Sequence, residues 1–307
     1  DFKFKLAIPK LDTDMKRLGV LMGPGLISAG IQQFNLFTGQ WVASHQNGGM
    51  SYIFYSDRVN QLPLGIIGIA FGIVLLPELT KKLKGGRREE ARKSIESGMI
   101  MAMFVAIPAM VGMAVLAEPI MVALFRGGEF TLEKGVLCGQ ALMAFSIGCP
   151  AYIAARVMQA GYFANEDTKT PMKFTMISAV VNIILCLIAW VIMGSGGALH
   201  VGCAVATSVA GWVNILLLSW GLKKQGLLYV TRDFWVKFSK MLIASLVMGV
   251  AAWFVADLFK DLIYDGFRLI RIIIVGFIAS FGLVLYLLIS HIIGAANLNE
   301  LKAGFKR

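Results

Sequence analysis

Long stretches without a charged residue alternate along this chain with short stretches that are rich in lysine and arginine. A helix crosses the hydrocarbon core of a membrane in roughly 20 residues, and most of the uncharged stretches correspond to one such span. Phe174–Leu222 is long enough for two spans, which the Gly-rich segment Met193–Gly202 divides. The pattern therefore predicts an all-α fold, a polytopic membrane helical bundle with about eight transmembrane helices. The uncharged stretches are Leu18–Ser56, Val59–Pro77, Ser97–Ala117, Gly135–Ala155, Phe174–Leu222, Met241–Ala256 and Ile272–Asn299.

Short polar segments separate the expected helices and set the domain boundaries. A short amphipathic segment, Glu118–Phe125, follows the third span. The eight helices are expected near residues 18–43, 52–80, 95–116, 133–163, 171–193, 199–222, 236–257 and 269–293. The expected organisation is a basic amphipathic cytoplasmic segment at 1–17, a six-helix membrane lobe at 18–222, a cytoplasmic linker at 223–235, a C-terminal helix pair at 236–293 and a cytoplasmic tail at 294–307.

Lysine and arginine are distributed unevenly between the two sets of connecting segments. Of the 29 basic residues, 22 lie in the set that includes both termini and 5 in the other set. Basic segments remain on the cytoplasmic side of a membrane, so both termini are expected in the cytoplasm. Only 15% of the residues are charged, against about 25% in a soluble domain. The net charge of +11 therefore reflects membrane orientation and does not indicate nucleic-acid binding.

Residues of the types used in catalysis and metal binding are scattered along the chain. The three histidines (His45, His200 and His291) lie near the ends of different predicted helices. The four cysteines fall within apolar stretches, without the spacing of metal ligands, and are interpreted as small core residues. We therefore predict no enzyme activity, no cofactor and no metal. These cysteines are Cys138, Cys149, Cys186 and Cys203.

The first 17 residues are polar and of mixed charge, and they lack the pattern of a signal peptide. The chain also begins with Asp1 and not with methionine. From the missing methionine we expect it to be part of a longer protein.

The second predicted helix contains a charged pair. Asp57 and Arg58 enter an otherwise apolar helix, and Phe54, Arg58 and Gln61 share one face. An arginine at membrane depth indicates a functional site, and its planar guanidinium group can hold a phosphate through two hydrogen bonds. Two alternatives remain open: Arg58 could snorkel to the outer interface, or it could pair with Asp57.

Polar side chains also recur along the first predicted helix. Gln32, Asn35 and Thr38 are three residues apart and form one stripe. Amides facing lipid are costly, so this stripe is expected to face the bundle interior or a water-filled cavity. Hydrogen bonding between helices is the alternative to a role in ligand binding.

Arg156 and a few isolated polar residues lie in the later helices. Arg156 is about 13 Å from the cytoplasmic end of the fourth helix, close enough to snorkel to that face. Asn182, Thr207 and Asn214 are isolated in the fifth and sixth helices. For these three, hydrogen bonding between helices is favoured over ion coordination.

Several segments resemble the MviN/MurJ family of lipid II flippases. The most extensive are Tyr55–Lys81 (YSDRVNQLPLGIIGIAFGIVLLPELTK) and Ala155–Phe174 (ARVMQAGYFANEDTKTPMKF). Gly23–Phe37 and Cys203–Leu218 resemble the family as well. The resemblance extends along the whole chain and implies spans seven to fourteen of a fourteen-span, two-lobed flippase. The chain would then be the second lobe with two extra C-terminal helices, and the first lobe would be absent.

The resemblance implies a function and a set of site residues. Members of this family move the undecaprenyl-pyrophosphate-linked peptidoglycan precursor, lipid II, from the cytoplasmic to the periplasmic leaflet of the bacterial inner membrane by alternating access. Arg58 matches the arginine of the family's Asp-Arg motif, and the last two helices match the pair that forms a groove for the lipid tail. The expected substrate-binding residues are Arg58, Asp57, Gln61, Gln32, Asn35 and Arg156.

The resemblance also implies a possible cation site at Thr38, Asn182 and Thr207. Cys186 stands where a carboxylate would help. A hard cation requires oxygen ligands and negative charge, so we expect this site not to be retained.

Three kinds of partner are expected: the lipid-linked precursor, membrane lipids, and the first lobe, which could belong to the same longer chain or to a separate one. Two other functions remain open. One is a related multidrug or O-antigen-type exporter of the same superfamily, which would need a buried acid for cations. The other is a non-transporting membrane scaffold.

Overall fold

The computed structural model describes the backbone of residues 13–194 and 198–295, and all side chains within these ranges except those of residues 13–21, 24 and 66–73. Over these ranges the chain forms helices joined by short loops. They are α1 (Thr13–Ala43), α2 (Gly49–Lys84), α3 (Arg88–Val115), α4 (Ala117–Phe125), α5 (Leu132–Ala164), α6 (Lys169–Met193), α7 (Leu199–Lys224), α8 (Arg232–Leu258), α9 (Lys260–Tyr264) and α10 (Arg268–Ile292).

The helices confirm the predicted fold class. Eight of them coincide with the expected membrane helices, and α4 coincides with the amphipathic segment. The short helix α9 was not expected. The linker between the lobe and the last helix pair is shorter than the expected 223–235, because α7 continues to Lys224 and α8 begins at Arg232. Most of the expected segments 1–17 and 294–307 lie outside the described residues.

Six of the helices are long and apolar enough to cross a membrane, namely α3, α5, α6, α7, α8 and α10. This count covers only fully described stretches; α1 and α2 have 31 and 36 residues but include side chains that are not described. In α8 the exposed Trp235 and Trp253, 59% and 57% accessible, are 18 residues or about 27 Å apart. That separation is close to the hydrocarbon thickness, and tryptophan favours both membrane interfaces.

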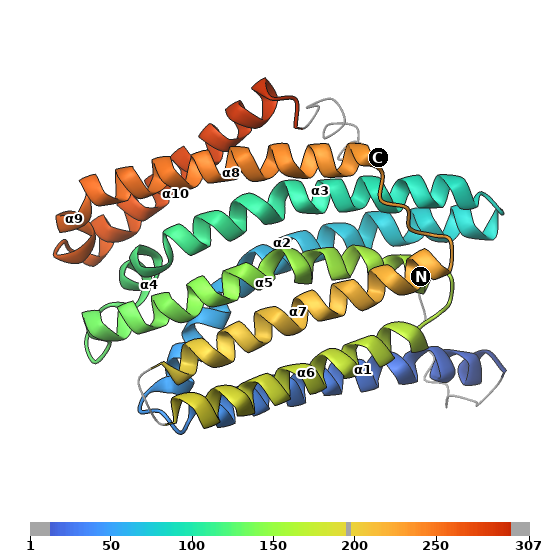
Figure 1. Ribbon diagram of the computed structural model, residues 1–307, viewed down its shortest axis with the longest axis horizontal. Helices are drawn as coiled ribbons and strands as arrows, with labels where there is room; N and C mark the ends of the chain where they lie inside the picture. Colours follow the sequence, from blue (N-terminus) through green and yellow to red (C-terminus); the bar gives the residue numbers. More distant parts are fainter. Residues whose placement is uncertain (1–12, 195–197, 296–307) are drawn as a thin grey trace, which may run out of the picture.

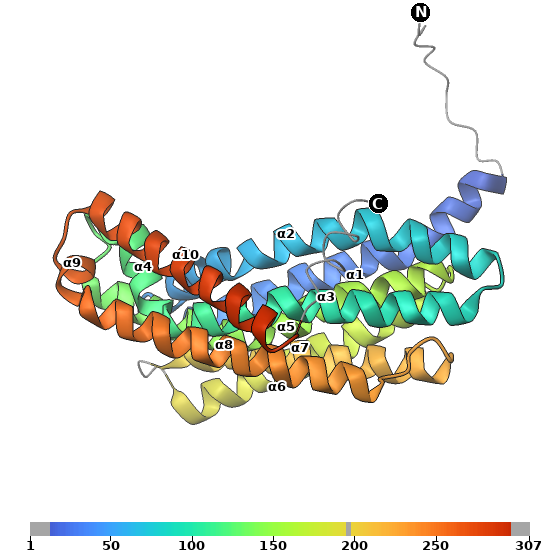
Figure 2. The ribbon, with the colours of Figure 1, turned by 90° about the horizontal axis from the view of Figure 1, so that it is seen from above.

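The axes of the long helices are roughly aligned, parallel or antiparallel, with α5 at the centre of the bundle (Figures 1 and 2). α5 packs against α2, α3 and α7. α1 packs against α6 at one edge, whereas α8 and α10 pack against each other at the opposite edge, where α8 also contacts α3.

Small residues allow α5 to occupy the centre. Gly148 is so close to α7 that a Cβ atom there would lie 2.9 Å from the Cα of Ser208. Small residues at such contacts let helix backbones approach closely within a membrane. At the same contact, Ser208 Oγ donates a hydrogen bond to the carbonyl oxygen of Ala144 at 2.7 Å.

Tyrosine hydroxyls connect neighbouring helices through backbone carbonyls. Tyr152 and Tyr162 of α5 donate to the carbonyl oxygens of Thr207 and Leu218 in α7, at 2.7 and 2.8 Å. An unpaired hydroxyl in an apolar interior is costly, so these bonds favour one register of α5 against α7.

We expect Gly148→Ala to destabilise the bundle by about 1–3 kcal/mol, the usual cost of overpacking a close contact. Thermal unfolding of the purified chain in detergent measures the effect. Gly276→Ala in α10 is the matched control, because a Cβ at Gly276 meets no described atom within 4 Å. Equal unfolding temperatures for the two variants would contradict this account of the α5–α7 contact.

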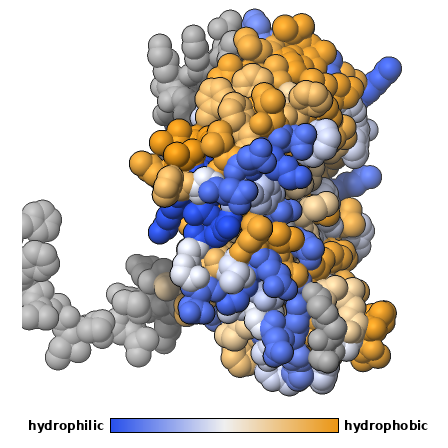
Figure 3. Space-filling view, turned by 90° about the vertical axis from the view of Figure 1, so that its left-hand side faces the viewer, coloured by the Kyte–Doolittle hydropathy of each residue, from blue (hydrophilic) through white to orange (hydrophobic). Residues whose placement is uncertain are grey.

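The two ends of the bundle differ in charge. The α2–α3 turn and the α7–α8 loop lie at one end, here called the basic end (Figure 1). Lys81, Lys82 and Lys84 lie in the last turn of α2, and Lys223 and Lys224 in the last turn of α7. The other end, here called the opposite end, includes α4, α9 and the loop between α1 and α2. Figure 3 faces the opposite end and shows hydrophilic residues gathered across its centre.

Candidate substrate-binding site

The start of α2 is held against α5 on one side, and its other side is left uncovered. Gly48 has a left-handed conformation, φ 75°, and leads the chain into the helix. Ser56 is fully buried, and its Oγ donates a 2.7 Å hydrogen bond to the carbonyl oxygen of Cys138 in α5. Because this side faces α5, Phe54, Arg58 and Gln61 are exposed on α2.

Arg58 presents its guanidinium group on the uncovered side of α2. The guanidinium carbon lies 4.8 Å from the centroid of the Phe54 ring, a cation–π contact one turn back along the helix. Asp57 does not form a close ion pair with Arg58; it accepts a hydrogen bond from the amide of Gln61. No carboxylate among the described residues lies within 4 Å of Arg58. Its N–H groups therefore remain available to an anion.

The polar stripe of α1 is divided in the structure. Asn182 of α6 is buried, and its Nδ2 donates to Asn35 Oδ1 at 2.8 Å. Cys186 Sγ lies 3.6 Å from Asn182 Oδ1. Asn35 therefore contributes to the contact between α1 and α6, whereas Gln32 is exposed.

The two threonines of the possible cation site use their hydroxyls locally. Thr38 Oγ1 donates to the carbonyl oxygen of Phe34, and Thr207 Oγ1 to that of Cys203, both at 2.9 Å and within the same helix. Among the described residues, no three His, Cys, Asp or Glu side chains lie close enough together to hold a metal ion. The four cysteines are buried and unpaired by disulfides.

The structure does not bring Arg156 to Arg58. Both α2 and α5 run from the opposite end to the basic end (Figure 1). Arg58 lies nine residues after the start of α2, whereas Arg156 lies eight residues before the end of α5. Both side chains are exposed, but they lie toward different ends of the bundle.

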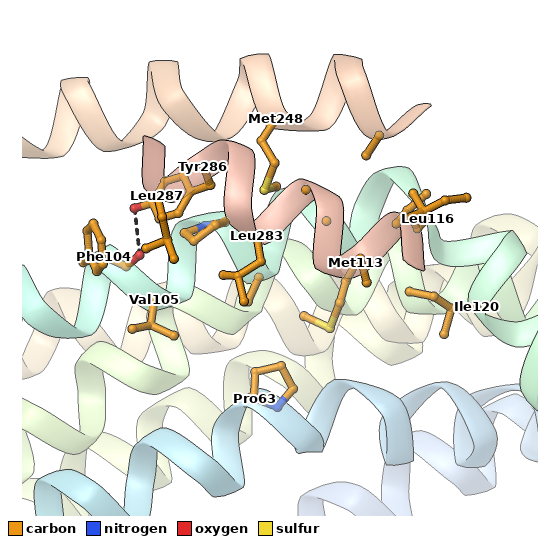
Figure 4. A pocket seen from close by; sticks show the side chains of 17 residues that line it. Pro63, Phe104, Val105, Met113, Leu116, Ile120, Met248, Leu283, Tyr286 and Leu287 are labelled. Carbon is orange, nitrogen blue, oxygen red and sulfur yellow. Dashed lines mark hydrogen bonds between the residues drawn. The ribbon is translucent and has the colours of Figure 1, made fainter. Parts of the chain in front are cut away.

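An apolar groove lies between α3, α8 and α10 and reaches α2 at Pro63 (Figure 4). It encloses about 390 Å³. The residues that line the groove are apolar apart from the hydroxyl group of Tyr286. That hydroxyl donates a hydrogen bond to the carbonyl oxygen of Phe104 at 2.8 Å. With this hydroxyl occupied, the groove has the chemistry of a hydrocarbon-binding site.

Sequence reasoning expected a groove at the last helix pair but did not identify its walls. Phe104 and Pro108 of α3 form one wall, and Gly282 and Tyr286 of α10 form another. Small residues recur on this side of α10 at Ala279 and Gly282. That spacing is the signal from which the groove-facing side could have been predicted.

Comparisons of sequence connect the chain to one protein family. The family model for the lipid II flippase MurJ matches residues 1–274. The probable lipid II flippase MurJ of Rhizobium meliloti (strain 1021) is 35% identical over 303 residues, which cover 97% of this chain and 55% of that protein. Its counterpart in Vibrio cholerae serotype O1 is 34% identical over 294 residues, covering 95% and 54%.

Solved structures give the same result for the fold. A structure of lipid II flippase MurJ in an inward closed conformation superposes with a TM-score of 0.67 and 25% identity, over 92% of this chain and 56% of that one. An outward-facing multidrug resistance MATE family transporter of the MOP superfamily gives a TM-score of 0.58 at 17% identity, over 93% and 66%. The second likeness concerns the fold alone.

The chain spans a little over half the length of the curated relatives that it matches. The match to the family model nevertheless covers most of its residues, and the bundle superposes on the family's solved fold. The chain is a multi-pass membrane protein that belongs to the MurJ family of lipid II flippases.

Proposed function

We propose that this chain is one half of a flippase that moves lipid II from the cytoplasmic to the periplasmic leaflet of the bacterial inner membrane. The proposal rests on the family membership and on two environments of the structure, the exposed guanidinium group of Arg58 and the apolar groove under α10. Lipid II combines a pyrophosphate with a long hydrocarbon chain, and each environment suits one of these parts.

The observation that carries the proposal is that α2 contributes to both environments. Arg58 lies on the uncovered side of α2, and Pro63, about 8 Å further along the helix, lines the groove. A pyrophosphate cannot enter hydrocarbon without a large desolvation cost. A wet cavity beside Arg58 removes that cost while the hydrocarbon chain remains in the groove.

Among the other candidate residues, Asp57 and Gln61 would orient Arg58 and bind sugar or peptide groups near it. Gln32 is exposed on α1, as are Phe34 and Phe37 beside it. We propose that this side of α1, together with the uncovered side of α2, borders a cavity whose other wall is the first lobe. Rocking of the two lobes would open the cavity alternately to each leaflet.

The proposed orientation places the basic end in the cytoplasm, by the positive-inside rule. Single cysteines test it, because the four native cysteines are buried. Asn47→Cys, exposed at the opposite end, should react with a membrane-impermeant maleimide added to whole cells with a permeabilised outer membrane. Arg88→Cys, exposed at the basic end, should react only after the inner membrane is opened. The reverse pattern of labelling would contradict this orientation.

Translocation of fluorescent lipid II in proteoliposomes tests the proposed function, with the chain joined to a first lobe from its own organism. We expect lipid II to become accessible on the far side of the bilayer. Export of a cationic drug without movement of lipid II would instead support the multidrug exporter that the fold also accommodates.

A further inference from the structure

Arg271 is the first residue on the buried face of α10. Arg271 is only 7% exposed and has the same helical phase as the residues of α10 that line the groove. Every other member of this face is apolar, small or hydroxyl-bearing. The face consists of Arg271, Val275, Ile278, Gly282, Tyr286 and Ser290.

Arg271 and Arg268 bind the C-terminal end of α4. Arg271 Nη1 and Nη2 donate to the carbonyl oxygens of Val122 and Arg126 at 3.4 and 3.3 Å. Arg268 Nη2 donates to the carbonyl oxygen of Leu124 at 3.3 Å. The carbonyl oxygen of Val122 also accepts from the backbone N–H of Arg126. Carbonyl groups of the last helical turn otherwise lack partners within the helix, and arginine side chains stabilise such ends.

This capping uses only a few of the available donors. Each guanidinium group has five N–H groups, and the three bonds occupy two on Arg271 and one on Arg268. The buried Nε of Arg271 has no hydrogen-bond partner among the described residues. Most donors of the pair therefore remain free for a ligand.

The cluster Arg126, Arg268 and Arg271, here called the arginine cluster, has no carboxylate within 4 Å among the described residues. The nearest carboxylate on α4, Glu118, accepts a 2.8 Å hydrogen bond from the Tyr264 hydroxyl. Burial and this neighbouring carboxylate raise the pKa of Tyr264, so its phenol stays protonated and keeps donating.

Other acidic residues at this end are solvent-exposed. Glu129 and Asp265 lie on the loops that follow α4 and α9, and Asp261 lies in the first turn of α9. Among the described residues, none of the three forms an ion pair with the arginine cluster. The cluster therefore combines three positive charges with only the partial negative charge of the α4 terminus. This excess of positive charge favours an anion.

The groove ends near the arginine cluster. Leu116 and Ile120 line the end of the groove nearest α4, and Ile120 is two residues before Val122, whose carbonyl binds Arg271. Along α10, Ile278 of the groove lies seven residues, or about 10 Å, from Arg271 on the same face. The end of the groove and the arginine cluster are thus about one to two helical turns apart, separated on this face by the buried Val275.

We propose that the arginine cluster binds the pyrophosphate of a polyprenyl-diphosphate lipid in the outer leaflet, with the hydrocarbon chain of that lipid in the groove. The inference rests on the proposed function, since it makes the arginine cluster a second site for the same lipid, at the end of the bundle proposed to face the periplasm. Two adjacent phosphate groups match three guanidinium groups better than the single phosphate of a glycerophospholipid does.

The whole site lies within this chain, so the purified chain in nanodiscs suffices for the test. The probes are undecaprenyl pyrophosphate, dioleoylphosphatidylglycerol and inorganic pyrophosphate, with binding followed by native mass spectrometry. Arg268→Gln should raise the Kd for undecaprenyl pyrophosphate at least about tenfold, which is about 1.4 kcal/mol, because it removes a charge-assisted hydrogen bond to the pyrophosphate. Arg126→Gln should act similarly, and Arg268→Lys should retain part of the affinity.

Lys260→Gln is the matched control, because it removes one exposed positive charge from the same end outside the arginine cluster. An equal loss with Lys260→Gln, an unchanged Kd with Arg268→Gln, or equal affinity for dioleoylphosphatidylglycerol would each overturn the inference. Tight binding of inorganic pyrophosphate alone would show an anion site without the groove and would overturn it as well.

The proposed function and this inference can fail separately. If wild-type chain binds undecaprenyl pyrophosphate and loses it with Arg58→Ala but not with Arg268→Gln, only the inference fails. If the wild-type chain binds no polyprenyl diphosphate while the two-lobed protein translocates lipid II, the inference also fails alone; absence of translocation by the two-lobed protein contradicts the proposed function. Thermal unfolding temperatures within the error of wild type establish that each variant is folded.

Discussion

Arg58→Ala should reduce translocation of lipid II about 30-fold or more in a protein that contains both lobes. Arg58 is exposed on α2, stacked on Phe54 and not paired with a carboxylate within 4 Å. Truncating one partner of a hydrogen-bonded charge pair costs about 2–5 kcal/mol, and each 1.4 kcal/mol is a factor of ten. Appearance of fluorescent lipid II on the far side of proteoliposomes measures the rate.

Two further variants separate charge from geometry. Arg58→Lys should retain part of the activity, because an ammonium group keeps the charge but lacks the planar fork. Arg88→Ala removes an exposed arginine from the basic end and should leave translocation unchanged. Normal translocation by Arg58→Ala would mean that Arg58 is an interfacial anchor that snorkels to the membrane surface.

The fold was predictable because a membrane imposes a simple rule on sequence. A span must exclude charge for roughly 20 residues, so the uncharged stretches alone marked the positions of α3, α5 and α10. Helix α9 escaped prediction because it has only five residues, two of them charged, and no apolar period. Its place depends on the burial of Ile263, a tertiary contact that local sequence does not contain.

The contacts between helices were not predictable, because apolar helices in a membrane give little indication of their neighbours. Asn35 belonged to the polar stripe of the first helix and Asn182 was an isolated amide, and only the packing of α1 against α6 pairs them. From the sequence, Arg271 is one of the five basic residues assigned to the less basic set of connecting segments. Its hydrogen-bond acceptors are backbone carbonyls at the end of α4. Every residue has a backbone carbonyl, so the sequence contains no acidic side chain that would identify this contact.

The role of Arg58 was predictable only in part. Its charge within an apolar helix marked it from sequence as a functional candidate. Whether it paired with Asp57 was open, and the bond between Asp57 and Gln61 depends on side-chain geometry that only the structure describes. The opening of the groove beside the same helix, at Pro63, required knowledge of where α3 and α10 pack.

This chain alone should not translocate lipid II. An alternating-access cavity requires two walls, and the chain spans a little over half the length of its relatives. The sides of α1 and α2 that carry Gln32 and Arg58 are uncovered. A charged residue at the centre of a bilayer costs about 2.5–3.5 kcal/mol on insertion scales, so this surface favours association with a first lobe over contact with lipid.

Proteoliposomes that contain only the purified chain should therefore show no transfer of fluorescent lipid II above the rate of protein-free liposomes. Co-expression of the first lobe should restore transfer, and a first lobe paired with the Arg58→Ala chain should not. The latter control distinguishes a completed cavity from a general increase in membrane leakage. Transfer by the chain alone at the rate of the two-lobed protein would contradict the proposal. A homodimer would then supply the second wall, and cross-linking of two copies through Gln32→Cys would identify it, because Gln32 is exposed on α1.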